Sequence, residues 1–197
     1  MLTMRGVRWV VLLGCALLLA ACSRDKGPAQ QAITAAEAAL NAAQPEAAKY
    51  VPDQVQSVAG ALQGAKDAFA KGDYTAALNG AKDLDAKAKA LTTAAAAKKE
   101  ELTKQWDELS ASQPKTLELL QAKVTALQKA KKLPAGLDKA KLEEANASVA
   151  ALTQEWAVAS DAFKAGNLME AVDKGKDSQA KSAELMTTLG VQPATKP

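Results

Sequence analysis

The chain of 197 residues has two cysteines and no histidine, which limits the chemistry that its side chains could carry out. Without histidine, Ser-His and Cys-His catalysis and the usual nitrogen and sulfur zinc sites are excluded by composition. Adjacent acidic residues occur at Asp107-Glu108 and Glu143-Glu144, but neighbours in a helix point apart and make poor catalytic pairs. We therefore predict no catalytic, metal or cofactor site, and a protein that is not an enzyme.

The second cysteine, Cys22, follows a segment with the features of an export signal in their usual order. Arg5 and Arg8 precede an apolar run at residues 9–19, too short for a comfortable membrane span, and Leu19-Ala20-Ala21 leads into Cys22. This arrangement resembles the lipobox of bacterial lipoproteins. The resemblance implies cleavage before Cys22, a diacylglycerol on its sulfur and often an acyl chain such as palmitate on the new N-terminus. The alternative is an ordinary signal peptide with an incidental cysteine.

The lipobox reading has consequences for location and charge. Residues 1–21 become a signal peptide that removes Cys15, so no free thiol remains for a disulfide or a metal. Ser23, where inner-membrane retention signals usually have Asp, implies a lipid anchor at the periplasmic face of the outer membrane. Loss of Arg5 and Arg8 lowers the basic residues from 25 to 23 against 22 acidic ones, which gives no reason to expect nucleic-acid binding.

One phrase occurs twice and indicates the architecture. Residues 67–94 align without a gap to residues 161–188, beginning with DAFAKGDY and DAFKAGNL. An apolar heptad stripe stops at Gly72 in one copy and at Gly166 in the other, where glycine can adopt the left-handed conformation that ends a helix. Asp73 and Asn167 follow as N-caps, with Glu170 in the capping-box position of the second copy. The phrase therefore predicts a tight turn between two antiparallel helices.

Other breakers divide the rest of the chain. Pro45 ends the first helix, Asp53 caps the second, Ser112–Pro114 separates the third from the fourth, and residues 131–138 precede the fifth. Gly190 closes the last helix. We expect helices at residues 27–43, 53–71, 73–111, 112–130, 138–165 and 167–189.

These helices predict an all-α fold, an elongated antiparallel bundle of about six helices with two similar three-helix halves. The predicted divisions are a signal peptide at 1–21, helical units at 22–111 and 112–190, and a tail at 191–197. Alanine at many stripe positions allows close helix approach, so stability is expected to depend on five aromatic residues. Trp156→Ala is expected to cost about 3–5 kcal/mol if that residue is in the core. The five aromatic residues are Phe69, Tyr74, Trp106, Trp156 and Phe163.

Two family resemblances concern the helical body. Gly72, Tyr74, Ala77 and Ala81 resemble the central turn of a tetratricopeptide repeat, but the terminal proline is missing and the helices are too long. Residues 22–100, including YVPD at Tyr50–Asp53, resemble an uncharacterised family of alanine-rich bacterial envelope lipoproteins. In some members of that family, the corresponding segment is followed by an OmpA-like peptidoglycan-binding domain. In this chain, a second helical unit follows it instead. The family implies no activity.

Two functions follow as hypotheses. The first is a lipid-anchored, non-enzymatic scaffold or protein-interaction adaptor of the cell envelope, with an envelope protein of unknown identity as partner. The alternative is a periplasmic carrier or binder of lipid or of a cell-wall fragment, which would need a cavity between helices. A purely structural spacer is a third option.

Overall fold

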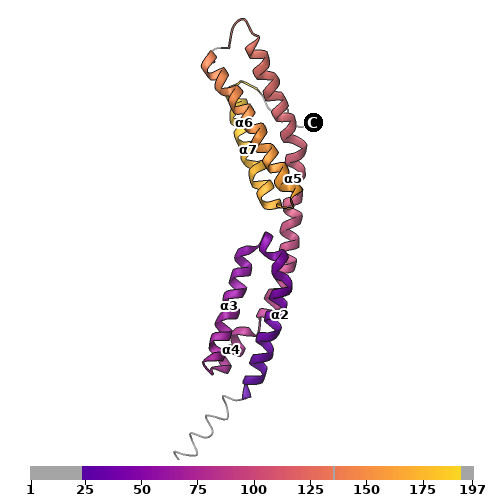
Figure 1. Cartoon of the computed structure of the whole chain (residues 1–197), viewed down its shortest axis with the longest axis vertical. Coiled ribbons are helices and arrows are strands. Elements are labelled where there is room, and N and C mark those ends of the chain that lie inside the picture. The colour runs from indigo at the N-terminus through magenta and orange to yellow at the C-terminus, as the bar shows by residue number, and fades with distance from the viewer. Residues whose placement is uncertain (1–23, 135, 192–197) are drawn as a thin grey trace, which may run out of the picture. The chain divides into compact units, whose positions relative to one another are not determined.

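The structure is a computed structural model that describes residues 24–134 and 136–191, and its described residues form helices and connecting turns, with no strand among them (Figure 1). The all-α prediction is confirmed. The chain divides into two compact units, unit 1 (Met1–Lys98) and unit 2 (Lys99–Pro197). The helices are α2 (Lys26–Tyr50), α3 (Pro52–Ala70), α4 (Tyr74–Ala81), α5 (Leu84–Gln128), α6 (Lys139–Lys164) and α7 (Leu168–Thr188).

Each unit is a small helical bundle. In unit 1, α2, α3 and α4 pack against one another, and the first part of α5 continues from α4 after a two-residue turn. In unit 2, the remainder of α5 shares a hydrophobic cluster with α6 and α7. The boundary between Lys98 and Lys99 falls inside α5, so the one helix belongs to both units.

The repeated phrase forms the same turn in both units, as predicted. Gly72 has φ +80° and Gly166 has φ +82°, a backbone conformation that side chains other than hydrogen disfavour. The Gly72 amide donates to the Phe69 carbonyl at 3.0 Å, and the Gly166 amide donates to the Phe163 carbonyl at 2.9 Å. The amide after each glycine donates to the carbonyl five residues back, which completes the hydrogen-bond pattern of a Schellman C-cap.

The predicted N-caps are only partly correct. Asp73 accepts a hydrogen bond from the amide of Ala76 at 3.0 Å, as expected. Asn167 precedes α7 but makes no side-chain cap bond, so the cap predicted there is wrong. Asp53 does not cap α3, because that helix begins one residue earlier at Pro52. Proline suits this first position since it has no amide hydrogen to satisfy.

The breaks predicted at two prolines are wrong. Pro45 lies inside α2 and Pro114 lies inside α5. A proline in a helix removes one hydrogen bond and costs about 3 kcal/mol. Burial on both sides offsets this cost, since α2 buries Leu40 before Pro45 and Tyr50 after it. Buried residues likewise flank Pro114 along α5, with Leu109 before it and Leu117 after it.

A break occurs instead where one helix was expected at 73–111. The helix that starts at Tyr74 ends at Ala81, and α5 begins at Leu84 after a turn at Lys82 and Asp83. In the second copy the corresponding helix, α7, continues unbroken to Thr188. The two copies therefore share the glycine turn but differ in the helix that follows it.

Alanine is the commonest buried residue in unit 1. Ala29, Ala36, Ala43 and Ala47 form a buried stripe along α2, interspersed with Ile33, Leu40 and Tyr50. Small side chains also meet between α3 and α4, where a Cβ added at Gly80 would lie 3.5 Å from the Cβ of Ala65. The predicted alanine seam is confirmed here, and it lets these helices pack closely.

Leucine is the commonest buried residue in unit 2, whose core is built from larger side chains. Around Pro114, α5 buries Leu109, Gln113 and Leu117 in turn. The hydrophobic cluster joins α5, α6 and α7. Its buried members are Leu117, Leu120, Val124, Leu127, Leu142, Ala145, Val149, Leu152, Met186 and Leu189.

Of the five aromatic residues expected to form the core, only Trp106 is fully buried, with 5% exposed. Phe69, Tyr74 and Trp156 are half-buried. Phe163 is 38% exposed, so the prediction that it is a buried core residue is wrong, although its ring stacks on Trp106. It lies in the last turn of α6, just before the Gly166 turn that leads into α7.

Two helical glycines should respond differently to substitution by alanine. Gly64→Ala is expected to stabilise by about 0.5–1 kcal/mol, because an added Cβ there meets nothing within 4 Å and the unfolded chain loses freedom. At Gly175 an added Cβ would lie only 3.0 Å from Cδ1 of Leu109, so Gly175→Ala should show no such gain. Urea unfolding of both variants checks this, and an equal gain at both positions would contradict the tight packing at Gly175.

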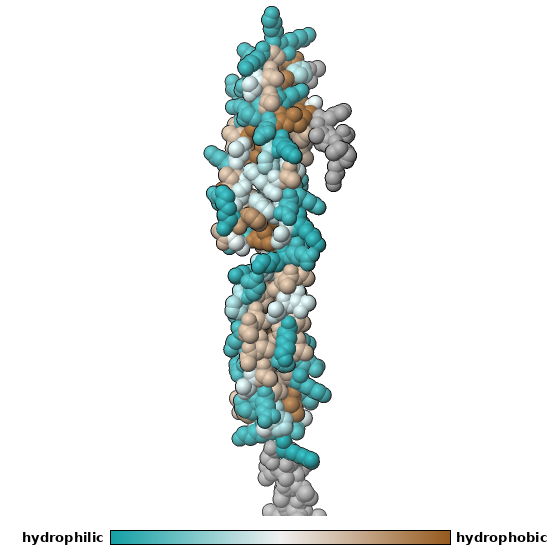
Figure 2. All heavy atoms as spheres, turned by 90° about the vertical axis from the view of Figure 1, so that its right-hand side faces the viewer, coloured by the Kyte–Doolittle hydropathy of each residue, from teal (hydrophilic) through white to brown (hydrophobic). Residues whose placement is uncertain are grey.

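Charged side chains are spread over the surface of both units. Figure 2 shows teal hydrophilic residues distributed along each unit, with pale and tan residues between them. Two surface ion pairs at i,i+4 spacing have nitrogen–oxygen distances of 2.7 Å, Asp85–Lys89 and Glu100–Lys104. Among the described residues, no helix is both long and apolar enough to cross a membrane.

Candidate functional site

Cys22, the site residue singled out in the sequence, lies outside the described residues, and its lipidation stays a prediction. The described chain begins two positions later at Arg24, which is exposed. The residues flanking the repeated turns, Lys71 and Lys164, are exposed as well. The candidate sites within the described residues are two grooves of unit 2 and one buried polar layer.

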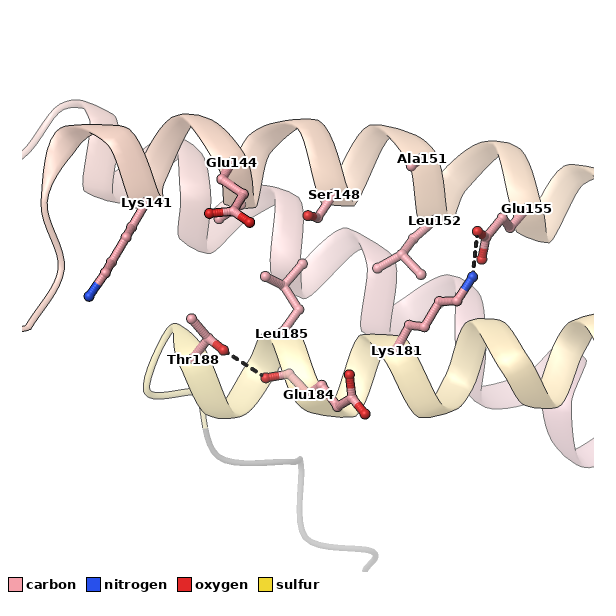
Figure 3. A pocket seen from close by; sticks show the side chains of 11 residues that line it. Lys141, Glu144, Ser148, Ala151, Leu152, Glu155, Lys181, Glu184, Leu185 and Thr188 are labelled. Atoms are coloured by element: carbon pink, nitrogen blue, oxygen red, sulfur yellow. Dashed lines mark hydrogen bonds and ion pairs between the residues drawn. The ribbon is translucent and has the colours of Figure 1, made fainter.

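The first groove lies between α6 and α7 and has a volume of about 500 Å³ (Figure 3). Leu152 and Leu185 point between the two helices and form its apolar floor. An ion pair crosses one end, where Nζ of Lys181 lies 2.7 Å from Oε1 of Glu155. The hydrogen bond from Lys181 to Glu155 raises the pKa of this lysine, although burial opposes the shift. Lys181 therefore stays charged and bridges the groove.

Charged side chains border the apolar floor of this groove on both helices. Glu144 and Glu184 border it opposite one another, together with Lys141, so charges of both signs surround the apolar floor. Lys141 donates to the carbonyl of Gly136 at 3.0 Å. Within the described ranges, no cluster of three or more histidine, cysteine, aspartate or glutamate residues could hold a metal ion. The lining could contact a polar chain or an amphiphile.

The second groove lies between α5 and α6, is open to solvent and has a volume of about 900 Å³. Its lining is more apolar than that of the first groove. Pro114, Leu117 and Ala122 contribute from α5, and Thr153 and Trp156 contribute from α6. Trp156 is half-buried because its ring stacks on Trp106, with ring centroids 5.2 Å apart and planes 8° apart. Of the two grooves, this one is the larger and has the more apolar lining.

A buried polar layer crosses the core of unit 2. The side-chain nitrogen of Gln113 donates to the hydroxyl of Ser178 at 3.0 Å and to that of Ser182 at 2.8 Å. Gln113 is 1% exposed, and its Oε1 has no hydrogen-bond partner. Sequence reasoning missed this layer, although its signal was present. Gln113 continues the spacing of Trp106 and Leu109, and the two serines lie four residues apart, which places them on one face of a helix.

Comparisons with known proteins add no assignment. No family model, no curated protein and no solved structure matches the chain. The resemblances to lipobox lipoproteins and to an alanine-rich envelope family therefore stay predictions from the sequence.

Proposed function

We propose that the protein is a lipoprotein anchored through Cys22 at the periplasmic face of the bacterial outer membrane, where it serves as a non-enzymatic scaffold or adaptor. The observation that carries the proposal is the Leu19-Ala20-Ala21-Cys22 box, which follows a charged and then apolar segment. The helical body starts almost at once, with α2 beginning at Lys26. A body of packed helices with exposed grooves is suited to binding other proteins.

The anchor is tested by Cys22→Ala in the producing cell. Growth with an alkyne-bearing fatty acid should label the parent chain, and Cys22→Ala should lose the label entirely, since the thiol that carries the lipid is gone. The variant should also leave the membrane fraction, because a lipid anchor of two or more chains is what holds such a protein stably. Cys15→Ala is the matched control and should keep full labelling, since Cys15 lies in the segment that is removed. Unchanged labelling of Cys22→Ala would exclude the anchor.

The adaptor role is tested by photocrosslinking in cells. A photoreactive residue at Lys71 or Lys164, both exposed, should trap one discrete envelope protein that mass spectrometry identifies. Adducts to the protein itself alone would contradict an adaptor and favour a spacer.

Ser23→Asp would move the protein to the inner membrane if residue 23 sets its address, and density fractionation measures that shift.

A second candidate function is a carrier of lipid or of a cell-wall fragment. The α5–α6 groove favours it, because its volume of about 900 Å³ lies within the range of small-molecule sites. Its lining is apolar and includes the half-buried Trp156. Mass spectrometry of the purified protein after organic extraction tests this role. A stoichiometric non-covalent lipid or sugar-peptide would support the carrier, and recovery of the protein without one would remove it.

A further inference from the structure

The start of α2 is close in sequence to the proposed lipid attachment. Two residue steps separate Cys22 from Arg24, the first described residue. Fully extended chain spans about 3.5 Å per residue, so this link reaches about 7 Å at most. The headgroup region of one leaflet is of similar thickness, roughly 5–8 Å. A lipid on Cys22 would therefore hold the beginning of α2 at the membrane surface.

Contacts within unit 1 place the glycine turn at the same end as the start of α2. The hydroxyl of Thr75, at the start of α4, donates to the carboxylate of Asp25 at 2.7 Å. Nζ of Lys26 lies 5.7 Å from the ring centroid of Tyr74. Tyr74 in turn packs edge-on against Phe69, with centroids 5.1 Å apart. We call this surface, formed by the start of α2, the end of α3 and the start of α4, the proximal end.

The side chains of the proximal end are those that membrane interfaces favour. Arg24, Lys26 and Lys71 are exposed cations, and Phe69 and Tyr74 are half-buried aromatic rings beside them. Aromatic rings are enriched at the level of lipid headgroups, and long basic side chains extend toward headgroup phosphates.

The acidic side chains of the proximal end accept hydrogen bonds from other groups of the protein. Asp25 accepts from Thr75, Asp67 accepts from Gln63 at 2.8 Å and Asp73 caps α4. Their number balances that of the cations, so the surface has no net charge to attract a membrane from a distance. Its contact with lipid must come from local pairing once an anchor has brought it close.

We propose that the proximal end rests on the phospholipid headgroups of the membrane that holds Cys22, with Lys26 and Lys71 pairing with phosphates and the Phe69–Tyr74 pair at the interface. The inference rests on the proposed anchor and adds a second contact to it. The lipid then does more than tether the chain, because unit 1 is held against the membrane in one orientation.

The test compares two exposed alanines in unit 1, Ala70 at the proximal end and Ala48 near the other end of α2. Ala48 is 22 residues beyond Lys26 along α2, which is about 33 Å at 1.5 Å per residue. Each is changed to cysteine in the full-length, lipidated protein and labelled with a thiol-reactive fluorophore. The protein is inserted into vesicles of phosphatidylethanolamine and phosphatidylglycerol that contain a lipid with a nitroxide quencher on its headgroup. Quenching should be several-fold stronger at Ala70→Cys than at Ala48→Cys.

The outcomes separate the two proposals. The parent chain without an added cysteine should not react with the fluorophore, because the thiol of Cys22 would be blocked by lipid. Reaction of the parent at Cys22 would overturn the anchor and the headgroup contact together. An unreactive parent with equal quenching at the two alanine positions would overturn the headgroup contact alone.

Charge reversal tests the residues themselves. Lys26→Glu combined with Lys71→Glu should lower quenching at position 70 toward the value at position 48, while the lipid mass on Cys22 stays unchanged. The matched control is Lys49→Glu with Lys87→Glu, two exposed positions of unit 1 away from the proximal end, and should leave quenching as it was. Full quenching in the Lys26 and Lys71 variant would overturn the role of these cations.

Discussion

Replacing Trp106 with alanine should lower the free energy of unfolding of unit 2 by about 3–5 kcal/mol, the usual cost of removing a large aromatic side chain from a core. Trp106 is 5% exposed, and its ring stacks on two others. Its centroid lies 5.2 Å from that of Trp156 and 4.8 Å from that of Phe163, with the planes 8° and 11° from parallel. Loss of this ring leaves both partners without their stacking contact.

The geometry explains why Trp106 matters more than its partners. Trp156 and Phe163 are seven residues apart on α6, which is about 10.5 Å along the helix. Two ring-to-ring spacings of about 5 Å fill that distance, so one ring from α5 lies between two rings from α6. Trp106 is the member that both stacking contacts share, and it is the most deeply buried of the three.

Urea unfolding, monitored by far-ultraviolet circular dichroism, measures this effect. Tryptophan fluorescence is not used as the probe, because removal of Trp106 itself changes the fluorescence. Phe163→Ala is the matched control, because Phe163 is 38% exposed and makes only one of the two stacking contacts. It should cost distinctly less than Trp106→Ala, and Trp156→Ala should fall between them. Equal costs for Trp106→Ala and Phe163→Ala would contradict a central role for Trp106.

Gln113→Glu should destabilise unit 2 by about 3 kcal/mol at pH 7, because it places a carboxylate in a buried site without a cation. The shape of the side chain is nearly unchanged, so the effect reports charge. The hydroxyls of Ser178 and Ser182 lie within 3.0 Å of the present amide nitrogen and could donate to a carboxylate. They should keep the cost below that of an unsolvated charge.

The pH dependence of Gln113→Glu identifies the cause. Burial raises the pKa of an introduced carboxyl group in the folded state above its unfolded value of about 4.3. The protonated form is then the one that suits the folded state, so stability is retained below about pH 4.3 and lost as the pH rises toward the folded pKa. Urea unfolding at pH 4 and pH 7, each compared with the parent protein, should show a much smaller deficit at pH 4.

Gln113→Leu is the control for volume. It removes the unpaired Oε1, and both serine hydroxyls can bond to carbonyls four residues back in their own helix. Its stability should therefore be close to that of the parent at both pH values. A loss in Gln113→Leu as large as that in Gln113→Glu would show that packing, and not charge, governs this position.

Features set by one residue and its neighbours could be predicted from the sequence. Gly72 and Gly166 adopt the left-handed conformation and Asp73 caps α4, because the chemistry of each turn is contained within a few positions. The heptad spacing likewise located most of the buried stripe. Lipidation of Cys22 depends on a similarly local signal but lies outside the described residues.

Features that depend on packing between helices were not predictable in the same way. Pro45 and Pro114 look like helix ends when read locally, but burial on either side keeps α2 and α5 continuous. Phe163 follows the apolar spacing of α6, but it lies in the last turn of that helix and is 38% exposed. The two grooves could not be inferred, because their shape depends on side chains from two helices at once. The Gln113 layer had a sequence signal in its spacing, but its partners in α7 are known only from the fold.

The alanine core of unit 1 has a mechanical consequence. Each buried methyl contributes little transfer free energy, so unit 1 should yield under load before the leucine and tryptophan core of unit 2. If Cys22 is held in a membrane and a partner holds unit 2, any tension between them passes through unit 1. Its described residues, 24–98, would span roughly 250 Å when fully extended at about 3.4 Å per residue, far more than the folded helices do. Unit 1 would then unfold and lengthen under tension, so that the distance between anchor and partner can vary while unit 2 stays folded.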